Sequence, residues 1–232
     1  MIDIRPFESL GAADHGWLDA RHHFSFAGYH NPDRMGWGAL RVWNDDAITP
    51  KGGFSAHPHR DMEIITYVRQ GAMTHRDSLG NEGRTEAGDV QVISAGTGIE
   101  HSEFNLEDEQ TRLFQIWIIP DEAGGQPRWD ARPFPTGDRS GQLEVLASGM
   151  EGDSGALQIR ADARVIGVKL SAGQSVSYAM NAGRHAYLVP ATGQVSVDGQ
   201  RLNARDGAAI TGLDSFTIEA AEDAEIVLVD AA

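Results

Sequence analysis

The chain has 232 residues, enough for one or two domains of roughly 100 to 150 residues with cores of their own. It contains no cysteine, which excludes disulfide bonds and thiolate metal ligands, so any metal must be bound by His, Asp or Glu. Its 34 acidic and 19 basic residues give a formal net charge of -15, which disfavours direct binding to nucleic acid or to anionic membranes. The sequence shows neither a signal peptide nor a stretch of about 18 apolar residues, so we expect a cytoplasmic protein.

The first 35 residues contain four histidines: His15, His22, His23 and His30. We do not expect a metal site here, because only His22 and His23 are close in sequence, and adjacent residues of a strand face opposite ways. We therefore expect structural or surface roles for these histidines. Residues 40–46 are predicted to be a strand that runs into a turn at Asn44, Asp45 and Asp46.

Two short polar clusters lie in the apolar, glycine-punctuated sequence between Gly52 and Asn105. They are His57-Pro58-His59 and His101-Ser102-Glu103. Side chains at positions i and i+2 of a strand point to the same face, so each cluster presents two ligands side by side. If the two strands are neighbours in a barrel, four side chains converge on one point: His57, His59, His101 and Glu103. Such nitrogen and oxygen ligands suit iron, copper, nickel, manganese or zinc, so the sequence predicts one metal site.

Two other residues near the clusters are weaker candidates. Glu63 would point to the same face of a strand as His57 and His59. It lies four residues beyond His59, however, which is roughly 13 Å along a strand that rises about 3.3 Å per residue. A straight strand cannot bring it to the same ion, and we therefore prefer Glu103 as the carboxylate ligand. His75 has a parity that allows it to face a barrel interior, but a lone histidine in a strand is more often a hydrogen-bonded structural residue, and we expect that role.

The region from Met62 to Pro120 has the pattern of short strands separated by turns, without helical periodicity. This pattern predicts a closed or double-sheet β-barrel of the jelly-roll type. Residues 121–141 contain Gly124-Gly125, three prolines and many charges, which are typical of a linker or loop.

An internal repeat is found when Gly71 is aligned with Gly193. In this alignment Ala179 and Asn181 take the positions of His57 and His59, and nothing like the second cluster follows Gly207. His185 takes the position of Glu63. We therefore predict an N-terminal barrel with the metal site at residues 1–125, a linker at 126–141, and a C-terminal barrel without a metal site at 142–232.

The two clusters and their surroundings resemble the two motifs of the cupin superfamily. More narrowly, HPHRDMEIITY (residues 57–67) and SAGTGIEHSE (residues 94–103) resemble the pirin family. Ser94 stands where cupins usually have a proline, and four residues rather than two separate Gly96 from His101; both departures are pirin-like. The resemblance implies an all-β fold of two cupin domains, the second without metal ligands. It also implies the ligand set His57, His59, His101 and Glu103.

Among pirin-like proteins this site implies ring-opening dioxygenase activity of the quercetin 2,3-dioxygenase type. The resemblance implies one divalent transition metal, which we expect to be Fe(II); Cu, Mn, Ni, Co and Zn are alternatives. In that reaction the 3-hydroxyl group of the flavonol gives its proton to Glu103, and dioxygen opens the ring with loss of carbon monoxide. The expected partners are thus a flavonol and dioxygen, and we expect a monomer.

Two alternative hypotheses stay open. Pirin-like proteins also act as metal-dependent interaction proteins that modulate a protein partner without turnover. A third hypothesis is another cupin metalloenzyme, such as an isomerase or hydrolase that uses zinc or manganese, because a cupin metal site supports many reactions.

Overall fold

The structure is a computed structural model that describes residues 1–133 and 140–232. In this part of the chain, two short 3-10 helices, η1 (Phe7–Ser9) and η2 (Pro32–Arg34), accompany strands that form four sheets. The predicted all-β class is therefore confirmed. Within the described residues, no helix has the length and apolar character needed to span a membrane.

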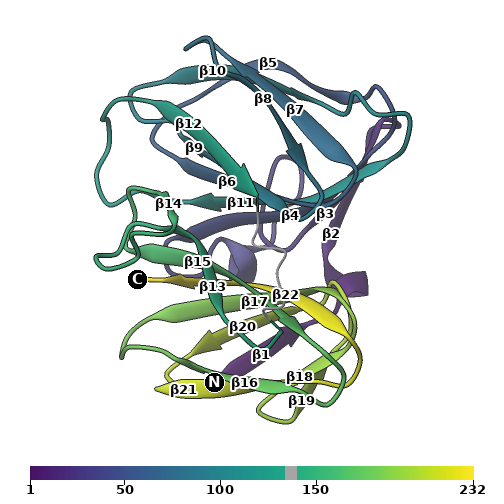
Figure 1. Cartoon of the computed structure of the whole chain (residues 1–232), viewed down its shortest axis with the longest axis vertical. Coiled ribbons are helices and arrows are strands. Elements are labelled where there is room, and N and C mark those ends of the chain that lie inside the picture. The colour runs from purple at the N-terminus through teal and green to yellow at the C-terminus, as the bar shows by residue number, and fades with distance from the viewer. Residues whose placement is uncertain (134–139) are drawn as a thin grey trace.

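The N-terminal half forms a large and a small sheet that together enclose a barrel (Figure 1). The large sheet has the strand order β12 (Arg128–Pro133), β9 (Asp89–Ser94), β6 (Glu63–Gln70), β11 (Thr111–Ile118), β4 (Leu40–Ile48), β3 (Leu18–His22) and β2 (Gly11–Asp14). The small sheet has the order β5 (Gly53–His59), β10 (Ile99–Phe104), β7 (Ala72–Asp77) and β8 (Glu82–Glu86).

The C-terminal half repeats this arrangement. Its large sheet has the order β1 (Ile2–Arg5), β20 (Gly207–Thr211), β17 (His185–Thr192), β22 (Ala224–Ala231), β15 (Ala163–Leu170), β13 (Glu144–Ser148) and β14 (Leu157–Gln158). Its small sheet has the order β16 (Ser175–Ala179), β21 (Ser215–Ala220), β18 (Val195–Val197) and β19 (Gln200–Leu202). The strand orders β9-β6-β11-β4 and β20-β17-β22-β15 correspond, which confirms the predicted repeat. Gly71 and Gly193 occupy equivalent turns, with φ of 72° and 75°.

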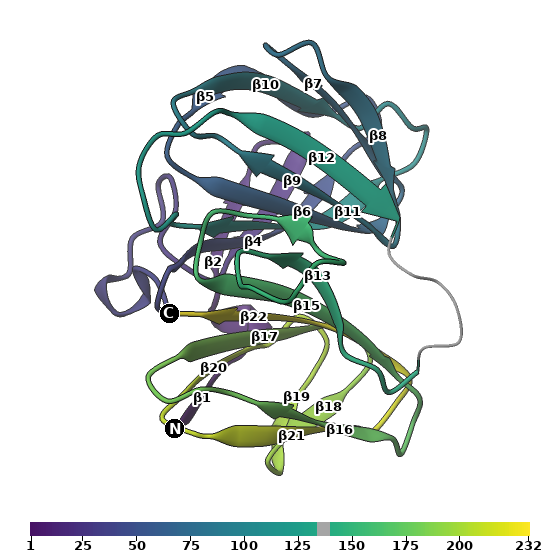
Figure 2. The same cartoon turned by 60° about the vertical axis from the view of Figure 1, so that its left-hand side comes forward.

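Side chains on the central strands alternate between a barrel interior and the contact between the two barrels. On β6, Ile64 belongs to a cluster inside the N-terminal barrel, whereas Ile65 and Tyr67 share a core with Val189 and Val227 of the other half. The two large sheets therefore stack face to face in the middle of the molecule, with the small sheets outside (Figure 2). Strands buried on both faces need nearly continuous apolar sequence, as β6 and β22 have.

Two segments, β1 and β12, do not lie where the predicted domain boundaries place them. β1 pairs with β20, so the first residues lie in the sheet of the C-terminal barrel. β12 pairs with β9 where the sequence predicted a linker or loop, and a strand therefore replaces the irregular structure expected at residues 128–133. Edge strands tolerate charges and prolines, so their sequences are easily read as loops. Residues 134–139 of the predicted linker lie outside the described residues, and the division at 125 and 142 stays a prediction.

The predicted turn at residues 44–46 is wrong, because these residues lie inside β4. Asn44 contacts the imidazole of His22, and Asp45 forms ion pairs with Arg69 and with Arg205 of the other barrel. Tertiary partners thus override the turn preference of Asn and Asp. One of these ion pairs also links the two barrels.

Replacing Tyr187 by phenylalanine is expected to destabilise the contact between the barrels. The hydroxyl group of Tyr187 lies 2.8 Å from Nδ1 of the buried His23, whose Nε2 lacks a partner among the described residues. Without the hydroxyl, the imidazole is buried with neither nitrogen paired, so we expect the free energy of unfolding to fall by about 1–3 kcal/mol. Urea unfolding measures this change. Tyr29→Phe is the control, and an equal loss there contradicts the expectation.

The interiors of the two barrels differ in polarity. The C-terminal barrel is filled by an apolar cluster that includes Val168, Leu188, Phe216, Ile218 and Leu228. The N-terminal barrel instead buries many polar side chains at inward positions: His22, Asn44, Asp46, Thr66, His75, Gln91, His101, Glu103 and Gln115. Buried polar groups are costly unless they are paired, so their concentration in one barrel indicates a functional site there.

Candidate metal centre

The two polar clusters of the sequence lie on neighbouring strands of the small N-terminal sheet. β10 pairs antiparallel with β5, and His101 lies opposite His57. Along its other edge β10 pairs with β7, where Glu103 lies opposite His75. Opposite residues of paired strands point to the same face, so the register of β10 brings imidazoles from both neighbours toward its inward side chains.

The start of β5 can approach β10 closely because residue 53 is glycine. A side-chain carbon at Gly53 would lie 2.4 Å from the backbone oxygen of Glu103, well inside a normal contact. The pairing of the two strands is irregular between His101 and Glu103, where a bulge shifts the register. Bulges redirect side chains near functional sites, and both residues remain buried on the inner face.

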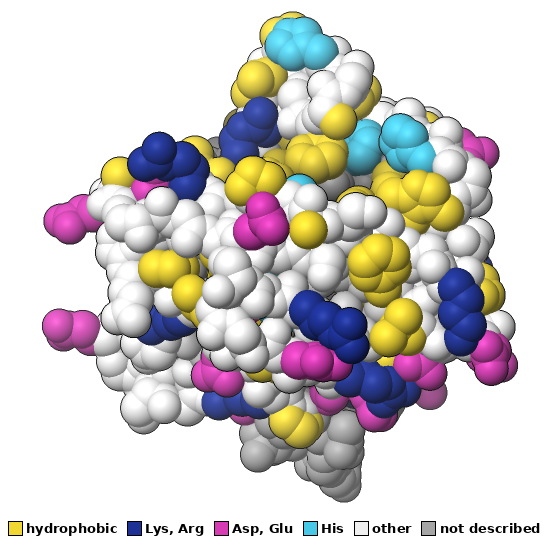
Figure 3. Space-filling model, turned by 90° about the horizontal axis from the view of Figure 1, so that it is seen from above, with side chains coloured by type: hydrophobic (Ala, Val, Ile, Leu, Met, Phe, Trp, Pro, Cys, Tyr) yellow, Lys and Arg dark blue, Asp and Glu magenta, His cyan; other side chains and the backbone are white. Residues whose placement is uncertain are grey.

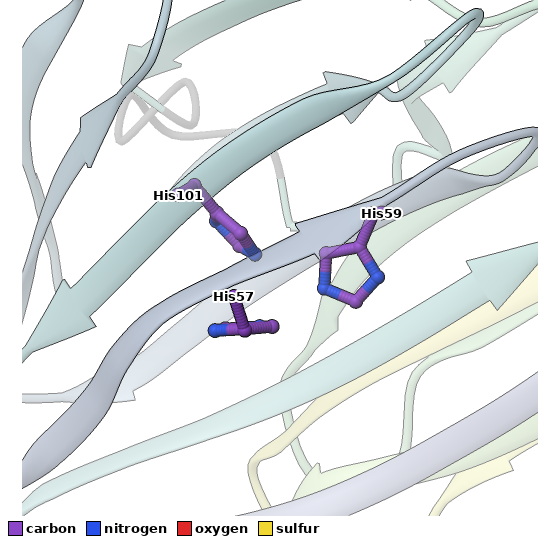
Figure 4. Close-up of side chains that lie close together, drawn as sticks. All are labelled: His57, His59 and His101. Carbon is purple, nitrogen blue, oxygen red and sulfur yellow. The ribbon is translucent and has the colours of Figure 1, made fainter.

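The side chains of His57, His59 and His101, which we call the histidine cluster, face one another (Figure 4). Their ring centroids are 4.5 Å apart for His57 and His101, 4.8 Å for His57 and His59, and 4.9 Å for His59 and His101. One nitrogen from each ring lies within 4.8 Å of one nitrogen of the others. A single ion placed between the rings can therefore contact all three.

The hydrogen bonds of the cluster leave nitrogen lone pairs free for an ion. His101 is buried, and neither of its ring nitrogens has a hydrogen-bond partner among the described residues. Nδ1 of His57 lies 2.7 Å from the backbone oxygen of Ser55, which can only accept, so Nδ1 carries the proton and Nε2 is free. Such a bond to the outer nitrogen is how proteins orient metal-binding histidines, and the residues present fit a metal ion.

The environment keeps the imidazoles of His59 and His101 unprotonated. Burial lowers the pKa of His101 to about 3, and His57 and His59 add to this effect as neighbouring cations. Burial also lowers the pKa of His59 to about 4, again with a contribution from His57. Metal ions bind only neutral imidazole, so at neutral pH no proton has to leave either ring when an ion binds.

Glu103 is buried beside the histidine cluster and is held by two amides. Its carboxylate accepts hydrogen bonds from Nε2 of Gln91 and, at 3.2 Å, from Nε2 of Gln115. Burial nevertheless raises the pKa of Glu103 to about 7, against the lowering effect of these two bonds. A carboxyl group with this pKa can exchange a proton near neutral pH.

Two tryptophans fix the orientation of these amides. The indole nitrogen of Trp129 donates to Oε1 of Gln91 at 3.2 Å, and that of Trp117 donates to Oε1 of Gln115 at 3.2 Å. An indole N–H can only donate, so each amide must turn its oxygen to the tryptophan and its NH₂ group to Glu103. Trp129 lies on β12, in the segment expected to be a linker.

His75, for which we expected a structural role, lies next to His101, with ring centroids 5.5 Å apart. His75, His101 and Glu103 form a second group whose ligand atoms lie within 4.8 Å of one another, so Glu103 shares its group with His75 rather than with His57 and His59. Nε2 of His75 is held by Asp77 at 2.9 Å, and its ring stacks on Trp129 with centroids 5.0 Å apart. These contacts hold one ring nitrogen and one face of His75, while Nδ1 is buried without a partner among the described residues, so its structural role stays a prediction.

The remaining candidates of the sequence analysis lie outside both groups. Glu63 is buried and accepts a hydrogen bond from the Ser94 hydroxyl group at 2.5 Å. The two groups also include none of the four histidines near the N-terminus. Sequence reasoning missed Gln91 and Gln115, although both are polar residues at inward positions of otherwise apolar strands, which is the signal that reveals them.

The histidine cluster is reached from the surface through an aromatic hollow. A hollow of about 390 Å³ is lined by His57 and His59 together with Phe54 and Trp117. Histidine and hydrophobic side chains lie next to one another on the face of the molecule shown in Figure 3. The arrangement gives a small, largely apolar molecule access to the cluster.

Addition of a divalent metal is expected to stabilise the folded protein. Nickel(II) at about 100 times its dissociation constant should raise the free energy of unfolding by about 2.7 kcal/mol, because the ion binds the folded state. For a chain of this size the melting temperature should rise by about 5–10 °C, which calorimetry measures. The double variant His57→Ala/His59→Ala is the control. A rise as large in this variant contradicts binding at the histidine cluster.

Family models match both halves of the chain. The model described as Pirin matches residues 4–118, and the model described as the quercetinase C-terminal cupin domain matches residues 145–231. A pirin-like protein of Caulobacter vibrioides is 64% identical over 232 residues, which is 100% of both chains. A quercetin 2,3-dioxygenase of Escherichia coli K12 is 40% identical over 231 residues, covering 99% of this chain and 98% of the relative.

Solved structures match the whole fold. The crystal structure of bacterial pirin YhhW from Escherichia coli in complex with nickel(II) has a TM-score of 0.94 and 39% sequence identity. The match covers 100% of this chain and 99% of that chain. The two barrels described above therefore have the arrangement of a known two-domain cupin fold.

Proposed function

The chain belongs to the pirin family, and from this premise we propose that it is a metal-dependent dioxygenase that opens the ring of flavonols such as quercetin. The observation that carries the proposal is the histidine cluster, with the buried carboxyl group of Glu103 next to it, whose pKa burial raises to about 7. The name of the Escherichia coli relative, quercetin 2,3-dioxygenase, supports the reaction class.

The proposed ligands of the metal are His57, His59, His101 and Glu103. The fit of the three imidazoles to one ion, and the nickel complex of the related bacterial pirin, support a divalent transition metal. We propose Fe(II) as the native ion; nitrogen and oxygen ligands of this kind also accept Cu, Mn, Ni, Co and Zn. When bound, the ion would lower the pKa of a hydroxyl group that contacts it and would make reaction with dioxygen accessible.

Glu103 is the proposed proton acceptor. Its pKa of about 7 leaves a large fraction of the carboxyl group ionised at neutral pH, so it can take the proton of the flavonol 3-hydroxyl group. The amides of Gln91 and Gln115 hold the carboxylate in place before and after the transfer. Both amides keep a hydrogen-bond donor toward Glu103 in either protonation state, which limits how far the side chain must move.

The walls of the hollow are largely aromatic, which disfavours water near the reacting atoms. Phe54, Trp117 and Phe26 line it, and the rings of Phe26 and Trp117 meet edge to face at 5.4 Å between centroids. Apolar walls favour a planar aromatic substrate and leave few polar groups that could hold competing water. A monomer in the cytoplasm stays a prediction.

The proposal is tested with an oxygen electrode and with elemental analysis of the protein as isolated. In air, metal-loaded protein should bleach the visible absorption of quercetin catalytically while oxygen is consumed, with one bound ion per chain. If no flavonol is turned over and a stable protein partner co-purifies, the interaction hypothesis is favoured. Turnover of another substrate without oxygen favours the third hypothesis of a different cupin enzyme.

A further inference from the structure

A second cavity adjoins the hollow that leads to the histidine cluster. It has a volume of about 630 Å³, within the range of roughly 300–1,000 Å³ typical of small-molecule sites. Four residues line both spaces: Trp17, Phe26, Phe54 and Gln115. The two spaces therefore lie against the same four side chains, and a ligand long enough to occupy both would contact these residues.

The far part of this cavity is lined by three buried polar side chains on adjacent strands. Asn44 and Asp46 come from β4 and His22 comes from β3. All three are at most 4% exposed. Oδ1 of Asp46 is buried and has no hydrogen-bond partner among the described residues. An unpaired buried carboxyl oxygen is unfavourable for folding, and Asp46 lines the cavity, so a ligand hydroxyl group there meets a carboxyl group that lacks a full set of partners.

The contact between His22 and Asn44 determines which hydrogen-bonding group His22 presents to a ligand in the cavity. Nδ1 of His22 lies 2.8 Å from Oδ1 of Asn44, which can only accept, so Nδ1 carries the proton and Nε2 of His22 is left as an acceptor. Burial lowers the pKa of His22, so the imidazole is neutral. Burial, with the negative charges of Asp45 and Glu103, raises the pKa of Asp46 well above its usual value, so its carboxyl group can donate. This part of the cavity thus presents a donor and an acceptor without charge.

The walls between this polar end and the histidine cluster are aromatic. The rings of Trp17 and Phe54 meet edge to face with centroids 5.0 Å apart, and Tyr29 stacks against His22 with centroids 6.3 Å apart. Edge and face contacts of this kind bind flat aromatic rings. A charged ligand group would lack a counter-ion at Asp46 and His22, whereas a phenol hydroxyl can accept from one and donate to the other.

We propose that this cavity binds the hydroxylated outer ring of a planar polyphenol, with a ring hydroxyl group paired to Asp46 and His22 while the other end of the molecule lies at the histidine cluster. The inference rests on the proposed function and deepens it, because it names the feature that selects among flavonols. Asp46 and His22 are binding residues in this account, and they do not touch the reacting atoms.

The test measures binding of two flavonols to the nickel-loaded full-length protein without oxygen, by quenching of tryptophan fluorescence. Quercetin carries hydroxyl groups on its outer ring, and galangin is the same flavonol without them. We expect the wild type to bind quercetin about tenfold more tightly than galangin, which is the effect of roughly one net hydrogen bond. Asp46→Leu should lose this tenfold advantage and keep its affinity for galangin within about twofold.

Two further variants keep the result interpretable. Asp46→Asn retains a donor and should keep most of the preference for quercetin, whereas His22→Leu should lose it as Asp46→Leu does. Galangin binding reports whether each variant has a folded site. Equal affinities of the two flavonols for the wild type, or a preference that survives Asp46→Leu, overturn the inference. A preference that depends on Asp46 without any turnover in air supports this inference and counts against the dioxygenase.

Discussion

The Glu103→Gln variant is expected to turn over flavonols about 10²- to 10⁴-fold more slowly per bound metal ion, the usual contribution of a positioned proton acceptor. Glutamine has nearly the same shape and can still accept a hydrogen bond from Gln91 or Gln115. It cannot take up a proton, so the loss should be in kcat. An oxygen electrode gives the rate, and elemental analysis gives the metal content by which the rate is divided.

The matched control is Glu63→Gln, a second buried carboxyl group in the same barrel. Glu63 is bonded to Ser94 and lies outside both groups of metal-competent side chains. Its replacement should change kcat by only a few fold. If Glu63→Gln loses as much activity as Glu103→Gln, the loss comes from disturbing the barrel. If Glu103→Gln stays within tenfold of the wild type, Glu103 is not the proton acceptor.

The His101→Ala variant should lose metal affinity by more than the roughly 10- to 100-fold that removal of an outer-shell partner costs. His101 is the one residue common to both groups, and its two ring nitrogens have no other partner in the part of the chain that the structure describes. Its loss leaves at most two imidazoles of the histidine cluster. Competition with a chromophoric chelator for nickel(II) measures the affinity.

His75→Phe separates the two groups from each other. Phenylalanine preserves a ring that can stack on Trp129, and it removes the nitrogen bonded to Asp77. If His75 supports the site without binding the ion, this variant should lose about 100-fold or less in affinity. A loss as large as that of His101→Ala would assign the ion to the group of His75, His101 and Glu103.

The two polar clusters, His57-Pro58-His59 and His101-Ser102-Glu103, could be predicted because their geometry is local. Residues two apart on a strand point to the same face. This places His57 beside His59, and it turns His101 and Glu103 toward the same barrel interior. The repeat could be predicted for a similar reason, since Gly71 and Gly193 both adopt positive φ at equivalent turns. Glycine meets that requirement without steric cost, so its position is visible in the sequence.

The partners of Glu103 could not be predicted, because they depend on the register of distant strands. Gln91 and Gln115 lie on β9 and β11, and nothing near them in sequence shows that they meet β10 inside the barrel. The strand at residues 128–133 was missed because it contains a proline and several charged residues, which edge strands and loops have in common. The turn expected at residues 44–46 failed because ion pairs with Arg69 and Arg205 stabilise an extended backbone there.

The most direct test of the metal centre is an anomalous difference map from crystals grown with one equivalent of the metal. The account predicts one strong peak per chain, about 2.1 Å from a nitrogen of His57, His59 and His101, with an oxygen of Glu103 as the fourth ligand. A peak bound by His75 without His57 and His59, or a peak elsewhere on the molecule, would contradict it.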